Sequence, residues 1–264
     1  MTKPILNYIL IAALVFSAAF TSCKSKEKCS VKLLESMTDE YGTTMFEYDE
    51  ENRIAKINLY EDDFLISTQT ITYCSDGSVI VESENSVDNE MNSKILYERN
   101  GNIITIGNIS LFKTLTIVNG VTVNEEGYGV KQEISYSDDE IGTWYDITDY
   151  QYLNGNLIKL ISVEETGIEG ENEFVLRFKY DDKKSPFYYC NTPQWFILHR
   201  FEFLLASNNN VIELSSDNIS DEVIRIVYKY DNDGFPTSRS TTEKHVFEGI
   251  AFETTFTYRC EKRQ

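Results

Sequence analysis

The chain has little of what most enzymes use for catalysis and metal binding. Only two of its 264 residues are histidines, His199 and His245, which leaves no histidine cluster for a metal and few bases for a serine or cysteine nucleophile. The strings H-E-x-x-H, G-x-x-x-x-G-K-[ST], G-x-S-x-G and G-x-G-x-x-G are absent. We therefore expect a non-enzymatic protein that holds neither a metal nor another cofactor.

Positive charge is also scarce. The chain has 24 lysines and arginines against 43 aspartates and glutamates, a formal net charge of -19 at pH 7. Such a balance repels phosphate backbones and anionic headgroups. Nucleic acid is therefore not an expected partner.

The first 22 residues predict an export signal. Lys3 provides a basic start, and residues 5–20 are nearly all apolar. This run is shorter than the roughly 20 apolar residues that a membrane-spanning helix needs, and it ends at the small polar pair Thr21 and Ser22. The segment is thus interpreted as a signal peptide and not as a membrane span.

Phe20-Thr21-Ser22-Cys23 resembles the lipobox of bacterial lipoproteins, in which the cysteine after the cleavage site becomes linked to diacylglycerol. The resemblance implies a lipid anchor on Cys23, and two or three acyl chains hold a protein firmly to a membrane. Residues 23–30 then form a lipidated tether and residues 31–264 a β domain. The expected location is the cell envelope, as an outer-membrane lipoprotein that faces the periplasm or the surface.

Four further cysteines are far apart in the sequence and form no C-x-x-C pair: Cys29, Cys74, Cys190 and Cys260. An oxidising envelope permits disulfides. Four cysteines allow three pairings, and the sequence does not choose among them.

A recurring unit of about 24 to 28 residues dominates the mature chain. Each unit has an alternating aromatic pair, a polar turn that often ends in glycine, and an alternating aliphatic run; Tyr48, Tyr73 and Tyr97 mark three successive units. Asn-Gly and Asp-Gly pairs favour the type I′ turns of β-hairpins. We place such turns at Asp76-Gly77, Asn100-Gly101, Asn119-Gly120, Asn154-Gly155 and Asp233-Gly234.

These patterns predict an all-β fold of repeated antiparallel β-hairpins that form a large twisted or rolled meander sheet. Whether the sheet stays open, rolls up or divides in two stays undecided. The one exception is an apolar run at 193–205 that opens with Pro193. Proline suits the first turn of a helix, so we expect a short helical segment there, with a buried strand as the alternative.

Two resemblances bear on the family. Phe46-Glu47-Tyr48-Asp49, Phe178-Lys179-Tyr180-Asp181 and Tyr228-Lys229-Tyr230-Asp231 look like the hairpins of YD-repeat proteins. Residues 178–212 resemble a narrower group, the uncharacterised lipoproteins of Bacteroides-type bacteria. That group is a domain of unknown function, so the resemblance implies fold and location but no activity and no catalytic residues.

The chain is rich in aromatic residues, which make up 13% of it. Exposed aromatics can stack on a sugar or anchor a protein partner, and Trp144, Tyr145 and Trp195 are the candidates for such contact. The leading hypothesis is a cell-envelope lipoprotein that acts as a non-enzymatic binding or scaffold module for a protein or glycan. The alternatives are a glycan or cell-wall hydrolase whose carboxylates converge only in the fold, and a structural subunit docked beside an outer-membrane protein.

Overall fold

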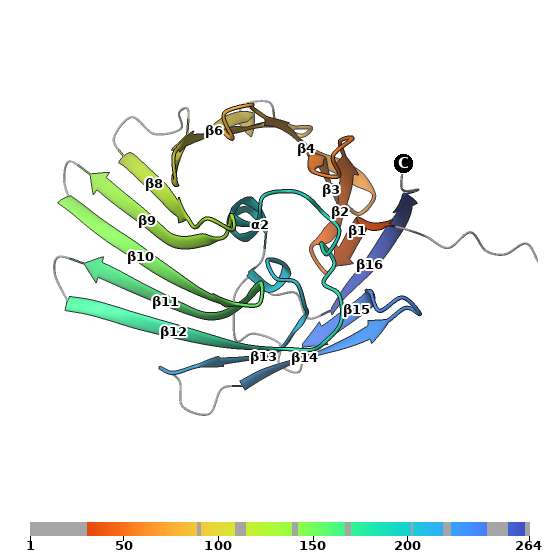
Figure 1. Cartoon of the computed structure of the whole chain (residues 1–264). Helices are drawn as coiled ribbons and strands as arrows, with labels where there is room; N and C mark the ends of the chain where they lie inside the picture. Colours follow the sequence, from red (N-terminus) through yellow and green to blue (C-terminus); the bar gives the residue numbers. More distant parts are fainter. Residues whose placement is uncertain are drawn as a thin grey trace, which may run out of the picture. The chain divides into compact units, whose positions relative to one another are not determined.

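The computed structural model describes residues 31–88, 91–108, 115–138, 142–166, 170–201, 203–218, 223–241 and 253–261. Sixteen strands form a closed barrel in which each strand pairs with the next in the chain and β16 lies beside β1 (Figure 1). The chain divides into two compact units, residues 33–259 and residues 1–32 with 260–264. The side-chain contacts and cavities described below lie within residues 33–259.

The barrel confirms the expected meander of antiparallel hairpins and resolves the open question of its closure. Its strands are β1 (Val31–Asp39), β2 (Gly42–Tyr48), β3 (Ile54–Glu61), β4 (Phe64–Tyr73), β5 (Val79–Asn85), β6 (Ser93–Asn100), β7 (Ile103–Asn108), β8 (Leu115–Val123), β9 (Gly129–Asp138), β10 (Gly142–Leu153), β11 (Asn156–Thr166), β12 (Gly170–Tyr180), β13 (Val211–Ser216), β14 (Val223–Tyr230), β15 (Pro236–Thr241) and β16 (Glu253–Glu261).

Alternation along the strands separates a buried inner face from an exposed outer face. In β14, Ile224 and Ile226 are buried while Arg225 and Val227 between and after them are exposed. A period of two is what a strand with one buried face requires. The apolar residues of the repeat therefore line the inside of the barrel.

Aspartate or asparagine side chains accept backbone N–H groups in the hairpin turns at one end of the barrel. We call this end the turn end; it includes residues 49–53, 74–78, 124–128 and 231–235. Asp49 Oδ1 accepts the backbone N–H groups of Glu51 and Arg53, at 3.1 and 2.8 Å. Asp231 Oδ1 accepts those of Asp233 and Phe235 in the same way, at 2.9 and 3.0 Å. Aspartate stabilises turns by such contacts with its own backbone, which explains why Asp follows Tyr in these units.

Both central residues have the positive φ of a type I′ turn at only one of the five predicted positions. At Asn154-Gly155 both residues have positive φ, 55° and 77°. At Asp76-Gly77, Asn100-Gly101 and Asp233-Gly234 only the glycine does, with φ of 86°, 64° and 81°. These three turns therefore have other geometries, and the last of them is longer and begins at Asp231.

The turn predicted at Asn119-Gly120 is wrong. Both residues lie inside β8, where Asn119 pairs with Ile134 and Gly120 with Glu133 on β9. β7 pairs with the same part of β8 on its other side. Hydrogen-bonded neighbours on both sides override the local preference of this dipeptide for a turn.

Tyrosine hydroxyls fasten neighbouring hairpins together at the turn end. Tyr48 pairs with Ile54 while Glu47 pairs with Lys56, so Ala55 is the extra residue of a β-bulge. A bulge disrupts the ladder of backbone hydrogen bonds locally, and Tyr73 on β4 donates its hydroxyl to the Ile54 carbonyl at 2.9 Å. The same contact recurs from Tyr48 to Leu34, from Tyr180 to Leu157 and from Tyr258 to Pro236.

Residues 182–209, which we call the plug, are inserted into one of these turns. The N–H of Asp181 bonds to the carbonyl of Asn210, and the N–H of Asn210 to Asp181 Oδ1, both at 3.1 Å. Asp231 and Phe235 make the same two bonds across an ordinary turn. The hairpin of β12 and β13 is thus closed at its base although 28 residues are inserted at its tip.

The plug lies inside the barrel (Figure 1), and its apolar residues belong to the two buried clusters of the core. Its helix α2 (Gln194–Arg200) and the 3₁₀ turn η2 (Phe203–Leu205) confirm the expected helical segment at 193–205. Trp195, Phe196 and Ile197 pack against buried residues of β1–β8 and β16, and Leu204 packs against those of β11–β14. Within the described residues, no helix has the length and apolar character needed to cross a membrane.

The tyrosine contacts lead to a prediction about stability. Tyr73→Phe removes the donor to the Ile54 carbonyl, and an unsatisfied buried group costs about 1–3 kcal/mol; we expect the free energy of unfolding in urea to fall by that amount. Tyr97→Phe is the matched control, because the Tyr97 hydroxyl is buried but has no hydrogen-bond partner within the described parts of the chain. If the free energy of unfolding fell equally in the two variants, the hydrogen bond from Tyr73 to Ile54 would not stabilise the contact between the hairpins.

Candidate functional site

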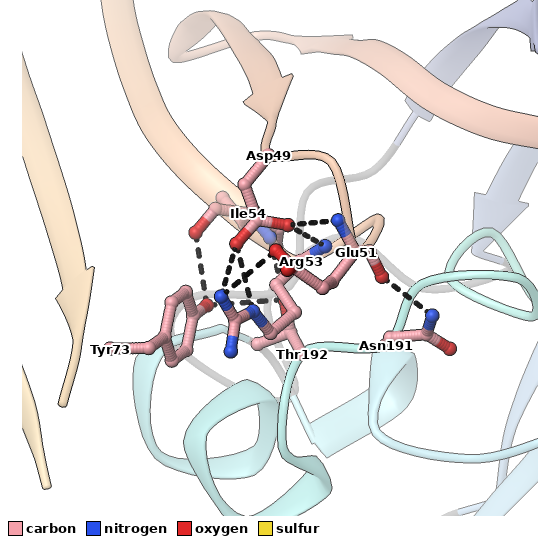
Figure 2. A network of polar contacts seen from close by, with 7 residues as sticks. All are labelled: Asp49, Glu51, Arg53, Ile54, Tyr73, Asn191 and Thr192. Atoms are coloured by element: carbon pink, nitrogen blue, oxygen red, sulfur yellow. Dashed lines mark hydrogen bonds and ion pairs between the residues drawn. The ribbon is translucent and has the colours of Figure 1, made fainter. Parts of the chain in front are cut away.

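The plug is tied to the barrel wall by a polar network at the turn end (Figure 2). The Ile54 N–H donates to the Thr192 hydroxyl at 2.8 Å, and Tyr73 reaches both Ile54 and Thr192. Asn191 contacts the same turn through the carbonyls of Asn52 and Glu51. These bonds fix the start of α2 and therefore the position of every residue along it.

Two cavities lie against the plug. One of about 140 Å³, the inner cavity, adjoins the first turn of α2 and is lined by Tyr128, Ser185, Phe187, Tyr188, Cys190, Thr192, Gln194, Ile197, Leu205, Ala206, Ser207 and Asn208. The other, of about 160 Å³, adjoins the last residue of α2 and is lined by Met37, Thr44, Ile57, Leu59, Ser67, Gln69, Arg200 and Phe201. We call the second the mouth cavity, because Leu59 and Ser67 lie towards the β3–β4 connection at the end opposite the turn end.

The mouth cavity combines an apolar lining with one positive charge. Arg200 ends α2 and donates from its guanidinium to Gln69 Oε1 at 2.5 Å. No carboxylate lies within ion-pair distance of Arg200 in the part of the chain that the structure describes. A half-buried arginine held only by a neutral amide keeps donors for another acceptor.

Tyr97 and His199 are buried beside Arg200. Burial raises the pKa of Tyr97, although the adjacent guanidinium opposes this shift. Burial, and then the charge of Arg200, lowers the pKa of His199 to about 4. His199 is therefore neutral at pH 7, and its ring nitrogen Nδ1 lies 3.5 Å from Gln132 Nε2. A neutral, packed imidazole of this kind is a structural group and not a proton carrier at neutral pH.

Cys190 lines the inner cavity. Burial raises the pKa of the Cys190 thiol to about 11, and a thiol that stays protonated is a poor nucleophile. The buried hydroxyl of Ser185 has no hydrogen-bond partner in the described part of the chain. Neither group has a base beside it among the lining residues, so the cavity lacks the parts of a nucleophilic site.

Neither cavity is lined by an aspartate or glutamate. Glycoside hydrolysis requires two carboxyl groups about 5 to 9 Å apart across the bond to be cleaved. Of the acidic clusters in the sequence, Glu61-Asp62-Asp63 lies exposed at the β3–β4 connection. No group of acids, histidines and cysteines suited to a metal occurs among the residues described. The cavities thus offer the hydrolase hypothesis no support.

The outer face of the barrel carries charges in directly opposed pairs. Glu213 on β13 lies between Lys179 on β12 and Arg225 on β14, with N–O distances of 2.6 and 3.9 Å. Glu82 faces Lys94 at 2.8 Å. Ion pairs near the surface contribute at most about 1 kcal/mol each, so these pairs place charge on the outer face without adding much stability.

The residues proposed from the sequence are dispersed. Trp195 is 2% exposed and belongs to the core between α2 and the strands, where its ring lies against that of Tyr97 at 5.8 Å between centroids. Tyr145 is half exposed on β10. Trp144 is in the same strand, but its side chain lies outside the described residues, as do Cys23 and His245.

Sequence reasoning missed the mouth cavity and Arg200. The only available signal was the position of a lone arginine at the end of an apolar segment. Its partner Gln69 is 131 residues away, and no local pattern connects the two.

The cysteines fall into two states. Cys74 and Cys190 are free, and Cys260 at the end of β16 is disulfide-bonded. The structure therefore limits the pairings that the sequence left open, because neither Cys74 nor Cys190 takes part in a bridge.

The lowered pKa of His199 predicts a loss of stability in acid. In the unfolded chain His199 is protonated below its ordinary pKa of about 6.5, whereas in the folded chain it is protonated only below about pH 4. The free energy of unfolding therefore falls by roughly 1.4 kcal/mol per pH unit as the pH is lowered between these two values. Between pH 7 and 4.5, the wild type is expected to lose about 2 kcal/mol more than His199→Gln in urea unfolding. Parallel pH profiles would contradict the assignment.

Comparison with known proteins shows the fold alone. No family model and no curated protein matches the chain. The crystal structure of a porin-like protein from Bacteroides uniformis is similar, with 16% identity, a TM-score of 0.52, and coverage of 87% of this chain and 97% of that one. A porin-like protein from Bacteroides vulgatus gives 12% identity, a TM-score of 0.54, and coverage of 86% and 99%. These similarities support the barrel but not the expected relation to YD-repeat proteins.

Proposed function

We propose that the protein is a cell-envelope lipoprotein whose barrel lies in water beside the outer membrane and acts as a non-enzymatic binding module. The observation that carries the proposal is the distribution of polar side chains, which is the reverse of that in a membrane-spanning barrel: the interior is apolar and the outer face carries charges. The similarity to two proteins described as porin-like is consistent with an envelope location.

A barrel that crosses a membrane needs the opposite arrangement, with an apolar band about 25 Å tall on its outside and a polar interior. Lysine or arginine at the bilayer midplane costs about 2–4 kcal/mol each. Here Glu82, Lys94, Glu213 and Arg225 lie within the strands and on the outer face. The wall is therefore suited to water.

The interior also argues against a pore. Sixteen strands are enough to enclose an aqueous channel, but the plug occupies this space. Trp195, Phe196 and Leu204 are almost completely buried. In the part of the chain that the structure describes, the plug thus lies where an aqueous channel would run.

With a wall suited to water, attachment to the membrane rests on the lipid predicted for Cys23. The tether at 23–30 would hold the barrel close to the membrane surface. Partners are then expected to be envelope proteins or glycans, in agreement with the acidic composition that disfavours nucleic acid.

The attachment can be tested by exchanging residues 1–23 for the signal peptide of an ordinary secreted protein, so that the rest of the chain is exported without lipid. We expect the native protein in the membrane fraction with a diacylglyceryl group on Cys23 by mass spectrometry. The exchanged form should appear, folded, in the soluble fraction without detergent.

Resistance to protease and the far-ultraviolet circular dichroism of a β protein provide the control for folding. If the exchanged form stays in the membrane although it is folded, the wall itself inserts into lipid and the proposal fails. An unmodified N-terminus on the native protein would refute the lipid anchor.

A further inference from the structure

The mouth cavity has the features of a binding site for one class of small molecule. We infer that it takes a monocarboxylate whose apolar body is about the size of a phenyl ring, with the carboxylate on Arg200. This inference rests on the proposed binding function and supplies its ligand class, but it does not depend on the lipid anchor.

The charge of the cavity comes from one side chain. Arg200 is the only cation in the lining, and the lining contains no acid. The guanidinium donates a hydrogen bond to Gln69 Oε1, which orients it and leaves other N–H groups available. The planar guanidinium fork matches the two oxygens of a carboxylate. A single positive charge suits a monoanion better than a phosphate group, which would need further cations.

The remaining lining sets the size and polarity of the ligand. Met37, Ile57, Leu59 and Phe201 form apolar walls, while Thr44 and Ser67 add hydroxyls. The volume of about 160 Å³ is close to that of engineered apolar cavities of about 150 Å³ that bind benzene. The apolar body of the ligand is therefore about one aromatic ring or a short branched chain.

A second observation points to a missing acceptor beside Arg200. Tyr97 is fully buried, yet its hydroxyl has no hydrogen-bond partner among the described residues. Buried polar groups are normally satisfied by protein or water. The neighbouring guanidinium, which opposes the rise in the pKa of Tyr97, has donors only, so it cannot accept the hydrogen of this hydroxyl. A carboxylate on Arg200 would bring an acceptor into this part of the barrel.

The position of Arg200 is fixed by the anchoring of helix α2, of which it is the last residue. The network around Thr192 fixes the start of α2, and Trp195, Phe196 and Ile197 bury its middle. A rigid helix so held presents its last residue at a defined place. Preorganisation of this kind lowers the entropic cost of binding.

Phenylacetate is the probe, with 2-phenylacetamide as the neutral and 2-phenylethylamine as the cationic molecule of similar size. Binding is followed by NMR on the purified full-length chain in a non-ionic detergent, with ¹³C-methyl methionine. Met37 lines the cavity, whereas Met45 and Met91 are exposed and serve as internal references. We expect phenylacetate to shift the Met37 methyl signal saturably and the two other probes to bind at least about tenfold more weakly.

Arg200→Gln should weaken phenylacetate binding about tenfold or more, and Arg200→Lys should retain part of it. Arg177→Gln is the matched control, because Arg177 is on the outer wall and pairs with Asp217. Ser67→Leu fills the cavity without changing its charge and should also abolish binding. Unchanged signals of Met45 and Met91 report that each variant is folded.

The inference fails if phenylacetate does not move the Met37 signal up to about 10 mM, a very weak binding limit. It also fails if the amide and the amine bind as well as the carboxylate, or if folded Arg200→Gln or Ser67→Leu binds as the wild type does. None of these outcomes bears on fractionation of the exchanged form, so failure of the inference is distinguishable from failure of the proposed function.

Discussion

The need to fill a wide barrel is the constraint on which the rest of this structure depends. Side chains alone fill a barrel of about eight strands, but sixteen strands leave a lumen that they cannot fill. The chain meets this need by inserting the plug. The apolar residues of α2 pack against the inward-facing apolar residues of the strands, and together they form the core. The bonds between Asp181 and Asn210 make the insertion compatible with the repeat, because they close the hairpin as if the plug were absent.

Polarity follows from the same constraint. A packed apolar interior leaves the outward positions of the strands to charged side chains, such as Glu213 between Lys179 and Arg225. A membrane barrel with a water-filled channel reverses both faces. Whether a barrel of this kind crosses a membrane is therefore inferred from the side chains on its outer face and not from the topology of its strands.

Much of the fold was readable from the sequence because hairpins are local. The alternation around Tyr48 and Tyr73 predicts strands, and the helical segment at 193–205 is signalled by Pro193 and its apolar run. Closure was not readable, because it rests on contacts such as that between Ser36 and Thr257, which are 221 residues apart. The failed turn at Asn119-Gly120 has the opposite cause: a strong local signal yields to two neighbouring strands. The candidate site depends on Arg200 meeting Gln69, a contact that no periodicity encodes.

Closure between the first and last strands also constrains how the protein assembles. Contacts between residues far apart in sequence form slowly, since long loops must be ordered first. Until β16 is available, β1 is an unpaired edge, and exposed edges invite pairing with other chains. Because the chain is synthesised from its N-terminus, that edge stays unpaired until the last residues have been made. We therefore expect folding in the cell to require chaperones that cover exposed strand edges.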